Sequence, residues 1–97
     1  MTYAYVQDVA EGWEHYERLA TALGDDIPDG LIVRVAGATS SGVRIIDVWE
    51  SEEAWTRFRN ERLRPAVRRL AGDASVEPSI FRGLRVRHVV RRGEPVR

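Results

Sequence analysis

Residues 31–55 read LIVRVAGATSSGVRIIDVWESEEAW, and the pattern of side chains in this stretch decides the fold. Two runs rich in Val and Ile, 31–37 and 42–50, lie on either side of the short segment ATSS, with a glycine at each shoulder. Such runs separated by a short polar segment are typical of a β-hairpin. Ser51 then precedes two glutamates, which indicates the start of a helix. The stretch therefore predicts strand, turn, strand and helix.

The residues before this stretch predict a strand and a helix. Residues 2–9, TYAYVQDV, are rich in Tyr and Val and favour a strand. Residues 11–24 place apolar side chains at helical spacing and end at Gly24, which suits a helix C-terminus. The apolar stripe of this amphipathic helix consists of Trp13, Tyr16, Leu19, Ala20 and Leu23.

The residues after the hairpin predict a long helix and a last strand. The helix runs to Gly72, and Pro65 inside it should kink or divide it. Residues 73–83 are expected to form a loop, and 84–90, LRVRHVV, a strand. The order βαββαβ favours a ferredoxin-like α+β fold, in which two helices cover one face of a four-stranded antiparallel sheet.

Length and composition limit the organisation of the chain and its partners. We expect 97 residues to form one domain over 1–92, with 93–97 as a flexible tail. The absence of Cys excludes disulfides and thiolate chemistry. The 15 basic and 15 acidic residues balance, which argues against a nucleic-acid partner because phosphate binding needs a positive face. Since no apolar run suits a signal peptide or a membrane span, we expect a soluble, cytoplasmic protein without a membrane partner.

The hairpin sorts its side chains onto two faces. A four-residue turn at 38–41 predicts three opposite pairs: Ala36 with Val43, Arg34 with Ile45, and Ile32 with Asp47. One face is almost wholly apolar and is expected to pack on the helices; it carries Leu31, Val33, Val35, Ile46 and Val48. The other face is expected to be free of helices and carries Ile32, Arg34, Ala36, Val43, Ile45, Asp47 and Trp49.

The second of these faces is too apolar to lie open to water. Exposed patches of Ile, Val and Trp usually mark an interface or a pocket. We therefore expect a second copy of the chain to stack its sheet there, which makes a homodimer with a cavity between the sheets. Asp47 and Arg34 would point into that cavity and pair with each other, since an unpaired buried carboxylate would cost several kcal/mol.

Three segments carry a resemblance to a known family. PDGLIVRVAG, GVRIIDVWESEEAWTRF and RLRPAV are similar to the small dimeric α/β-barrel proteins related to the antibiotic biosynthesis monooxygenases, over about residues 3–90. Arg34 stands where we would expect a His in similar small proteins of this group, and Val43 where we would often expect an aromatic residue. The resemblance implies a homodimer whose sheets form a barrel, with a pocket inside the barrel or between the sheet and helices of each protomer.

The resemblance also implies an activity. Members of this group act as cofactor-independent monooxygenases on aromatic or polyketide-like substrates of secondary metabolism, and neighbouring branches include cyclases, isomerases and haem-degrading enzymes. We therefore expect cofactor-independent oxygenation of a small aromatic or polyketide-like molecule. A cyclase or isomerase that needs no oxygen, and a non-catalytic ligand-binding or structural homodimer, remain the alternatives.

Arg34, Asp47 and His88 are the candidate catalytic residues. Arg34 would stabilise an enolate or phenolate oxygen, and Asp47 would orient Arg34 or take a proton. The alternative is a buried ion pair that only fixes the fold. His88, on the expected last strand, could act as a general base or a haem ligand. His15 lies at the edge of the first helix's apolar stripe and is interpreted as a boundary residue.

Apolar and aromatic residues are the candidates for substrate binding. They are Tyr5, Ile32, Ile45, Trp49, Trp55 and Phe58. The aromatic residues at helical spacing could equally form the core, and alternation does not settle which face of the first strand points to a pocket. The sequence has no phosphate-binding loop, nucleophile elbow or metal-ligand cluster, so we expect no metal and no cofactor, with haem as the alternative.

Overall fold

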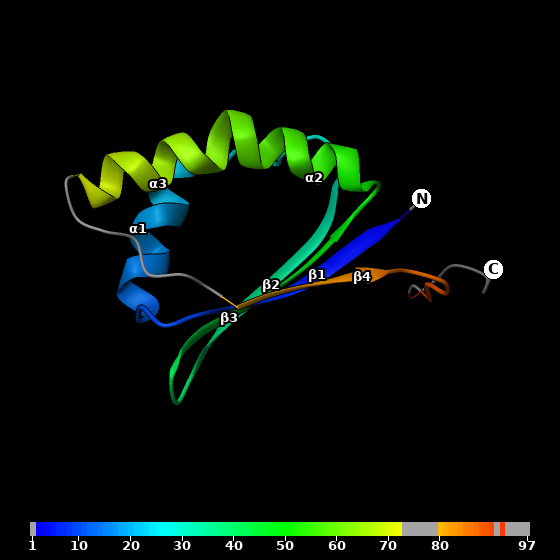
Figure 1. Cartoon of the computed structure of the whole chain (residues 1–97), viewed down its shortest axis with the longest axis horizontal. Coiled ribbons are helices and arrows are strands. Elements are labelled where there is room, and N and C mark those ends of the chain that lie inside the picture. Colours follow the sequence, from blue (N-terminus) through cyan, green and yellow to red (C-terminus); the bar gives the residue numbers. More distant parts are fainter. Residues whose placement is uncertain (1, 73–79, 91, 93–97) are drawn as a thin grey trace.

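The chain forms a four-stranded sheet covered by helices on one face (Figure 1). The computed structural model describes residues 2–72, 80–90 and 92. Their elements are β1 (Tyr3–Val9), α1 (Trp13–Leu23), β2 (Leu31–Thr39), β3 (Gly42–Trp49), α2 (Glu52–Phe58), the π-helix η1 (Arg59–Leu63), α3 (Arg64–Ala71) and β4 (Ile80–Arg85). The strands lie in the order β2-β3-β1-β4, and all neighbours are antiparallel. The predicted ferredoxin-like α+β fold is confirmed.

The helix after the hairpin begins at its predicted cap and is not broken by its proline. The Ser51 hydroxyl accepts a hydrogen bond from the Ala54 amide at 3.1 Å. Pro65 lies in the first turn of α3, where its missing N–H is easily accommodated. Before it, the Arg64 amide donates to the Arg59 carbonyl five residues back. Pro65 therefore does not divide the helix. The irregularity before it is a π turn, and α2, η1 and α3 follow one another as one continuous helical segment (Figure 1).

The turn between β2 and β3 is two residues shorter than predicted. Thr39 pairs with Gly42, so only residues 40–41 form the turn. A side chain at Gly42 would meet the Val9 carbonyl, which explains the glycine at this position. The register differs from the predicted one by two residues, which leaves each side chain on its predicted set and places Arg34 directly opposite Asp47. A β-bulge interrupts this pattern between Leu31 and Val33.

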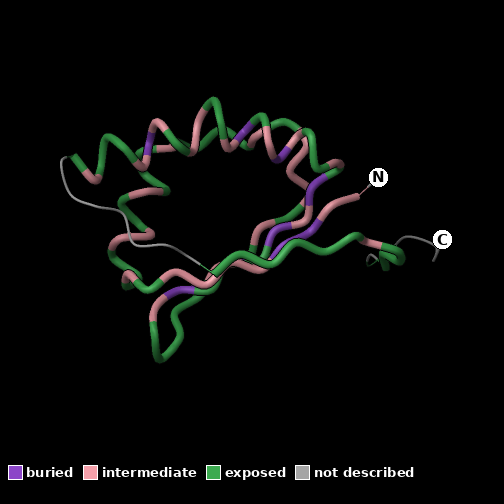
Figure 2. Tube along the Cα trace, viewed as in Figure 1, coloured by how far each residue is buried: buried purple, intermediate pink, exposed green. Residues whose placement is uncertain are grey.

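The helices cover the face that we expected to be open. Val43, Ile45 and Trp49 are buried in a cluster that includes Trp55 and Phe58. The set predicted to pack on the helices is instead open to solvent within this chain: the exposed fractions are 46% for Val33, 57% for Val35 and 41% for Ile46. Figure 2 shows buried residues on the central strands and on the inner side of the helices. The alternation identified both sets except at Leu31, which the β-bulge places against the buried cluster, and it assigned the helices to the wrong set.

The last strand begins and ends earlier than predicted. β4 pairs with β1 from Ile80 opposite Asp8 to Arg85 opposite Tyr3. Gly83 lies in this strand, where a Cβ would come within 2.7 Å of the Tyr3 hydroxyl, so a larger residue would make the Tyr3 side chain shift. Residues 86–90 follow the strand, and only 80–83 of the expected loop are described. The expected tail, 93–97, lies outside the described residues.

Candidate functional site

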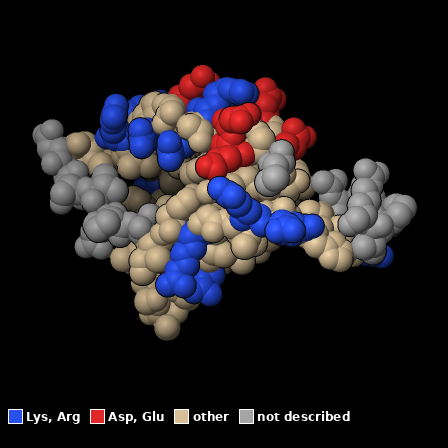
Figure 3. Space-filling view, turned by 45° about the vertical axis from the view of Figure 1, so that its right-hand side comes forward, with Lys and Arg blue, Asp and Glu red and all other residues tan. Residues whose placement is uncertain are grey.

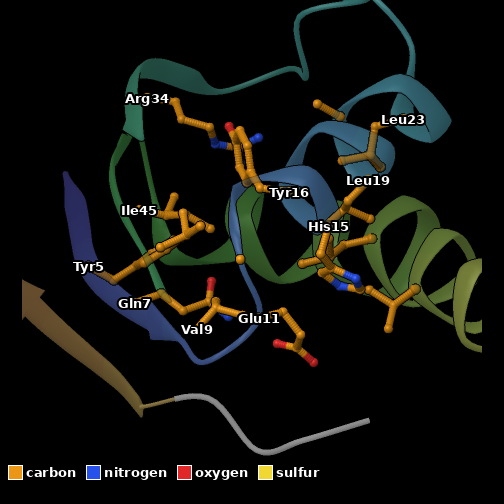
Figure 4. A pocket seen from close by; sticks show the side chains of 15 residues that line it. Tyr5, Gln7, Val9, Glu11, His15, Tyr16, Leu19, Leu23, Arg34 and Ile45 are labelled. Atoms are coloured by element: carbon orange, nitrogen blue, oxygen red, sulfur yellow. The ribbon is translucent and has the colours of Figure 1, made fainter. Parts of the chain in front are cut away.

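A cavity of about 130 Å³ lies between the helix-covered face of the sheet and the helices α1 and α3. No residue of α1 is fully buried, and four residues of its inner side, His15, Tyr16, Leu19 and Leu23, line the cavity. Figure 4 shows Leu19 and Leu23 of α1 and Ile45 of β3 around it. Its apolar lining consists of Val9, Leu19, Ala20, Leu23, Val43, Ile45, Leu63 and Val67. The predicted stripe of α1 is thus largely a cavity wall and not a closed core.

Polar side chains line the same cavity. They are Tyr5, Gln7, Glu11, His15, Tyr16 and Arg34. In Figure 4, Tyr16 of α1 lies beside the Arg34 side chain of β2, while His15 and Glu11 lie on another part of the wall. An apolar pocket with a few convergent polar groups is the usual form of a small-molecule site. This cavity is therefore the candidate functional site.

Asp47 anchors Arg34 at the wall of this cavity. Its carboxylate is fully buried and accepts hydrogen bonds from Arg34 Nε at 2.8 Å and Arg34 Nη2 at 2.7 Å. The Tyr5 hydroxyl donates to it at 2.5 Å and the Trp49 indole Nε1 at 3.1 Å. A carboxylate offers about four lone-pair sites, so these four bonds satisfy it. Asp47 is therefore tolerated in the core because three neighbours satisfy its charge.

The charges of this cluster favour the ionised pair and a neutral tyrosine. Burial acts to lower the pKa of Arg34, but the hydrogen bond and charge of Asp47, with smaller contributions from Tyr5 and Tyr16, raise that pKa on balance. Burial, together with the charge and hydrogen bond of Asp47, raises the pKa of the Tyr5 phenol. Arg34 therefore stays a cation and Tyr5 a hydrogen-bond donor throughout the physiological pH range.

Arg34 has donors left for a ligand. A guanidinium carries five N–H groups, and the two bonds to Asp47 use two of them. The side chain is 24% exposed, whereas Asp47 behind it is not exposed at all. Phe58 packs on the cation, with its ring centre 5.7 Å from Arg34 Cζ. The arrangement holds a fixed positive charge at an apolar cavity, which suits the binding of one oxyanion.

The predicted site residues divide into three groups. Tyr5, Arg34 and Ile45 line the cavity. Asp47, Trp49, Trp55 and Phe58 form the layer behind the cavity wall. The ring centres of Trp49 and Phe58 are 5.3 Å apart, and the ring of Trp55 lies 4.6 Å from that of Tyr5 in the wall.

Two predicted residues lie away from the cavity. Ile32 lies at the bulge of β2 and is half-buried, but it is not part of the cavity lining. His88 follows the end of β4, is exposed and does not reach the cavity of this chain. We had expected it on a strand facing the pocket, and the early end of β4 is the reason for the difference. Within residues 2–72, 80–90 and 92, no cluster of three His, Cys, Asp or Glu residues could bind a metal.

Three residues that line the cavity, His15, Tyr16 and Glu11, were not predicted as site residues. His15 was interpreted as a boundary residue, and Tyr16 as part of a core stripe. Both interpretations assumed that α1 packs directly on the sheet. One feature of the sequence could have indicated that His15 faces inward: it lies four residues before Leu19 and so shares a face of the helix with it. What the sequence could not show is that this face borders a cavity.

Comparison with known proteins gives similar structures and no sequence relative. No protein-family model matches the sequence, and no curated protein is similar to it at the sequence level. A Deinococcus radiodurans protein, provisionally assigned as an antibiotic biosynthesis monooxygenase, has a TM-score of 0.62 and 15% identity. The match covers 94% of this chain and 97% of that one.

A second similar protein is SnoaB, a cofactor-independent oxygenase from Streptomyces nogalater. Its structure has a TM-score of 0.56 and 14% identity, and a variant of it has a TM-score of 0.58 and 15% identity. Each match covers 92% of this chain and 94% of SnoaB. The chain shares the fold of these proteins. This agrees with the resemblance found in its sequence. Among the described helices, none is long and apolar enough to cross a membrane.

Proposed function

We propose that this protein is a cofactor-independent oxygenase of an enolisable or phenolic small molecule. The observation that supports it is the guanidinium of Arg34, fixed by a buried carboxylate at the wall of an apolar cavity. The oxyanion of the bound substrate lies on the free N–H groups of Arg34, and Tyr16 lies beside this contact (Figure 4). SnoaB, which has the same fold, is a cofactor-independent oxygenase.

The reaction needs a deprotonated substrate and oxygen. In the enolate, electron density at carbon reduces O₂ and forms a C–OOH group. Loss of water then leaves a carbonyl, so that a methylene plus O₂ gives a ketone plus H₂O. Arg34 stabilises the negative charge of the enolate, and the apolar walls exclude water, which strengthens that interaction. Asp47 serves as a positioning residue that holds the guanidinium in place.

The proposed assembly is a homodimer that is formed through the open face of the sheet. Exposed apolar side chains from three strands share this face: Val33, Val35, Ile46, Ile80 and Leu84. In Figure 3, acidic side chains gather over the helices, while the lower part of the molecule shows uncharged surface interrupted by basic side chains. An apolar face of this kind supports packing against a second copy of the same sheet.

Oxygen consumption tests the activity. The purified protein is given anthrone and a series of naphthols, and oxygen uptake and product mass are measured. We expect wild type to consume oxygen and Arg34→Ala to lose at least about 100-fold in rate, the scale of removing one oxyanion contact. Arg57→Ala is the control, because Arg57 is exposed on α2 and lies outside the cavity.

The alternatives predict other results of the same experiment. A cyclase or isomerase uses the same enolate contact but rearranges the substrate without oxygen uptake. A non-catalytic protein binds these compounds and returns them unchanged. Oxygen uptake that Arg34→Ala retains contradicts the proposed site.

A further inference from the structure

The proposed reaction needs a group that removes a proton, and Asp47 is unsuited to that task. Four hydrogen bonds from three residues already satisfy its carboxylate. Asp47 is also fully buried and is not part of the cavity lining, from which Tyr5 and Arg34 separate it. A proton acceptor must reach the proton that it abstracts, directly or through one water molecule. The base is therefore another residue of the cavity wall.

We infer that His15 is this base. Its imidazole is half-buried on α1 and lines the cavity that Arg34 also lines. The cavity of about 130 Å³ is close in size to an engineered cavity of about 150 Å³ that holds benzene, so one six-membered ring of a substrate fits in it, and further rings would lie at its open side. A ring bound there contacts both walls, with its oxygen at Arg34 and its acidic C–H toward His15. Histidine suits the task because it gains and loses a proton near neutral pH.

The other ionisable groups of the described cavity wall fit this role less well. Arg34 is a cation, and the Tyr5 hydroxyl keeps its proton and donates a hydrogen bond to Asp47. Tyr16 lies beside Arg34, where its hydroxyl can donate to the same oxyanion. Glu11 precedes α1, and in Figure 4 its carboxylate points away from Arg34. His15 is left as the acceptor across the cavity from the cation.

The proton transfer is a complete step without oxygen. The C–H bond next to the substrate carbonyl breaks, its proton goes to an imidazole nitrogen of His15, and the electron pair moves to the carbonyl oxygen at Arg34. This inference rests on the proposed function because it uses the same cavity and the same Arg34 contact. It can be tested separately, since enolate formation exchanges the C–H hydrogen with solvent whether or not O₂ then reacts.

The test is deuterium exchange under anaerobic conditions. Three ketones of increasing size, 2-indanone, 2-tetralone and anthrone, are incubated with the protein in deuterated buffer, and NMR measures the loss of their methylene signals. We expect wild type to accelerate the exchange of at least one ketone. His15→Gln and His15→Phe should lose at least about 100-fold, the lower end of general-base catalysis. Ligand-observed NMR should show that both variants still bind this ketone within threefold of wild type.

Two further variants complete the test. His88→Gln is the control: it removes the chain's other histidine, which is exposed beyond β4, and should exchange like wild type. Glu11→Gln tests the carboxylate of the cavity wall as the alternative base. Full exchange in both His15 variants, a loss in Glu11→Gln alone, or no exchange of any of the three ketones by wild type would overturn the assignment.

The two proposals fail in different ways. Exchange that depends on His15, without oxygen uptake in air, supports the base and rejects the oxygenase in favour of a cyclase or isomerase. Oxygen uptake that Arg34→Ala loses but His15→Gln retains supports the oxygenase and rejects His15.

Discussion

Each face of the sheet carries one aspartate–arginine pair, and the two pairs differ in what surrounds them. Under the helices, Arg34 of β2 binds Asp47 of β3 through two hydrogen bonds. On the open face, Arg44 of β3 binds Asp8 of β1 through two hydrogen bonds of 2.7 and 3.1 Å. The side chains of Arg34 and Asp47 are 24% and 0% exposed, whereas those of Arg44 and Asp8 are 54% and 36% exposed.

This difference shows that the surroundings, more than the contact, decide what an ion pair does. Within the single chain, water screens the Arg44–Asp8 pair, so either partner can be removed with little effect unless the proposed dimer covers the pair. Asp47 is shielded from water, so its charge depends on all three hydrogen-bonding neighbours. Removal of Asp47 leaves the Arg34 cation without a counter-charge beside an apolar cavity. The same contact is thus a surface feature on one face and part of a candidate site on the other.

Removal of the buried carboxylate should have the largest effect. We expect Asp47→Ala to lower the free energy of unfolding by about 3–5 kcal/mol, because Arg34 then loses its counter-charge while half-buried. Urea denaturation followed by circular dichroism measures this. A loss below about 1 kcal/mol would mean that the buried pair behaves like a surface pair and that the contrast between the faces is wrong.

A charge on the open face should have the next largest effect, on assembly. We expect Ile46→Arg to weaken dimer formation by at least about 100-fold, since burying an unpaired charge costs several kcal/mol. Analytical ultracentrifugation over a dilution series measures this. Leu70→Arg is the control, because Leu70 lies at the surface of α3 on the helix side of the molecule. A monomeric wild type would contradict the proposed dimer.

Removal of one donor to Asp47 should have a smaller effect. We expect Tyr5→Phe to lower the free energy of unfolding by about 1–3 kcal/mol, because the buried carboxylate loses one hydrogen bond while the ring is retained. Chemical denaturation measures this, with Tyr3→Phe as the control on the same strand. An equal loss in the two variants would contradict a special role for the Tyr5 hydroxyl.

Tyr5 should also make stability depend on pH at the alkaline end. Its pKa is raised above the ordinary 10.0, so above about pH 10 the unfolded chain loses a proton that the folded chain keeps. The contribution of Tyr5 to stability is complete below pH 10 and is lost as the pH rises toward the raised pKa. The stability of Tyr5→Phe should fall less steeply than that of wild type between pH 9 and 11. Thermal unfolding at a series of pH values measures both slopes, and equal slopes would contradict the raised pKa.

Removal of the exposed Asp8–Arg44 pair should have the smallest effect on stability. The hydrogen bond from Arg44 lowers the pKa of Asp8, so the pair stabilises the fold above the ordinary pKa of that carboxyl, and the stabilisation fades as the pH falls. We expect Asp8→Asn to change the denaturation midpoint at pH 7 within experimental error, and salt to remove any difference. A change as large as that of Asp47→Ala would show that the open face is deeply buried in the assembly.

Local signals predicted more of the fold than of the site. Ser51 caps its helix and Gly24 closes α1 with a φ of 85° because both effects depend only on neighbouring residues. The pairing of Arg34 with Asp47 followed from the cost of an isolated buried charge. The last strand was predicted at 84–90 and lies at Ile80–Arg85, because its place is decided by pairing with β1, which lies far from it in the chain.

The sequence by itself determined the order of the elements and the two sets of side chains on the sheet. Alternation along a strand is a property of the backbone, so even a hairpin register wrong by two residues kept both sets except at Leu31, beyond the β-bulge. Only the tertiary structure decided which set the helices cover and where the cavity lies. Both sets are apolar, and the choice depends on how Trp49, Trp55 and Phe58 pack and on how far α1 stands from the sheet. That packing joins residues far apart in the chain, which no local pattern records.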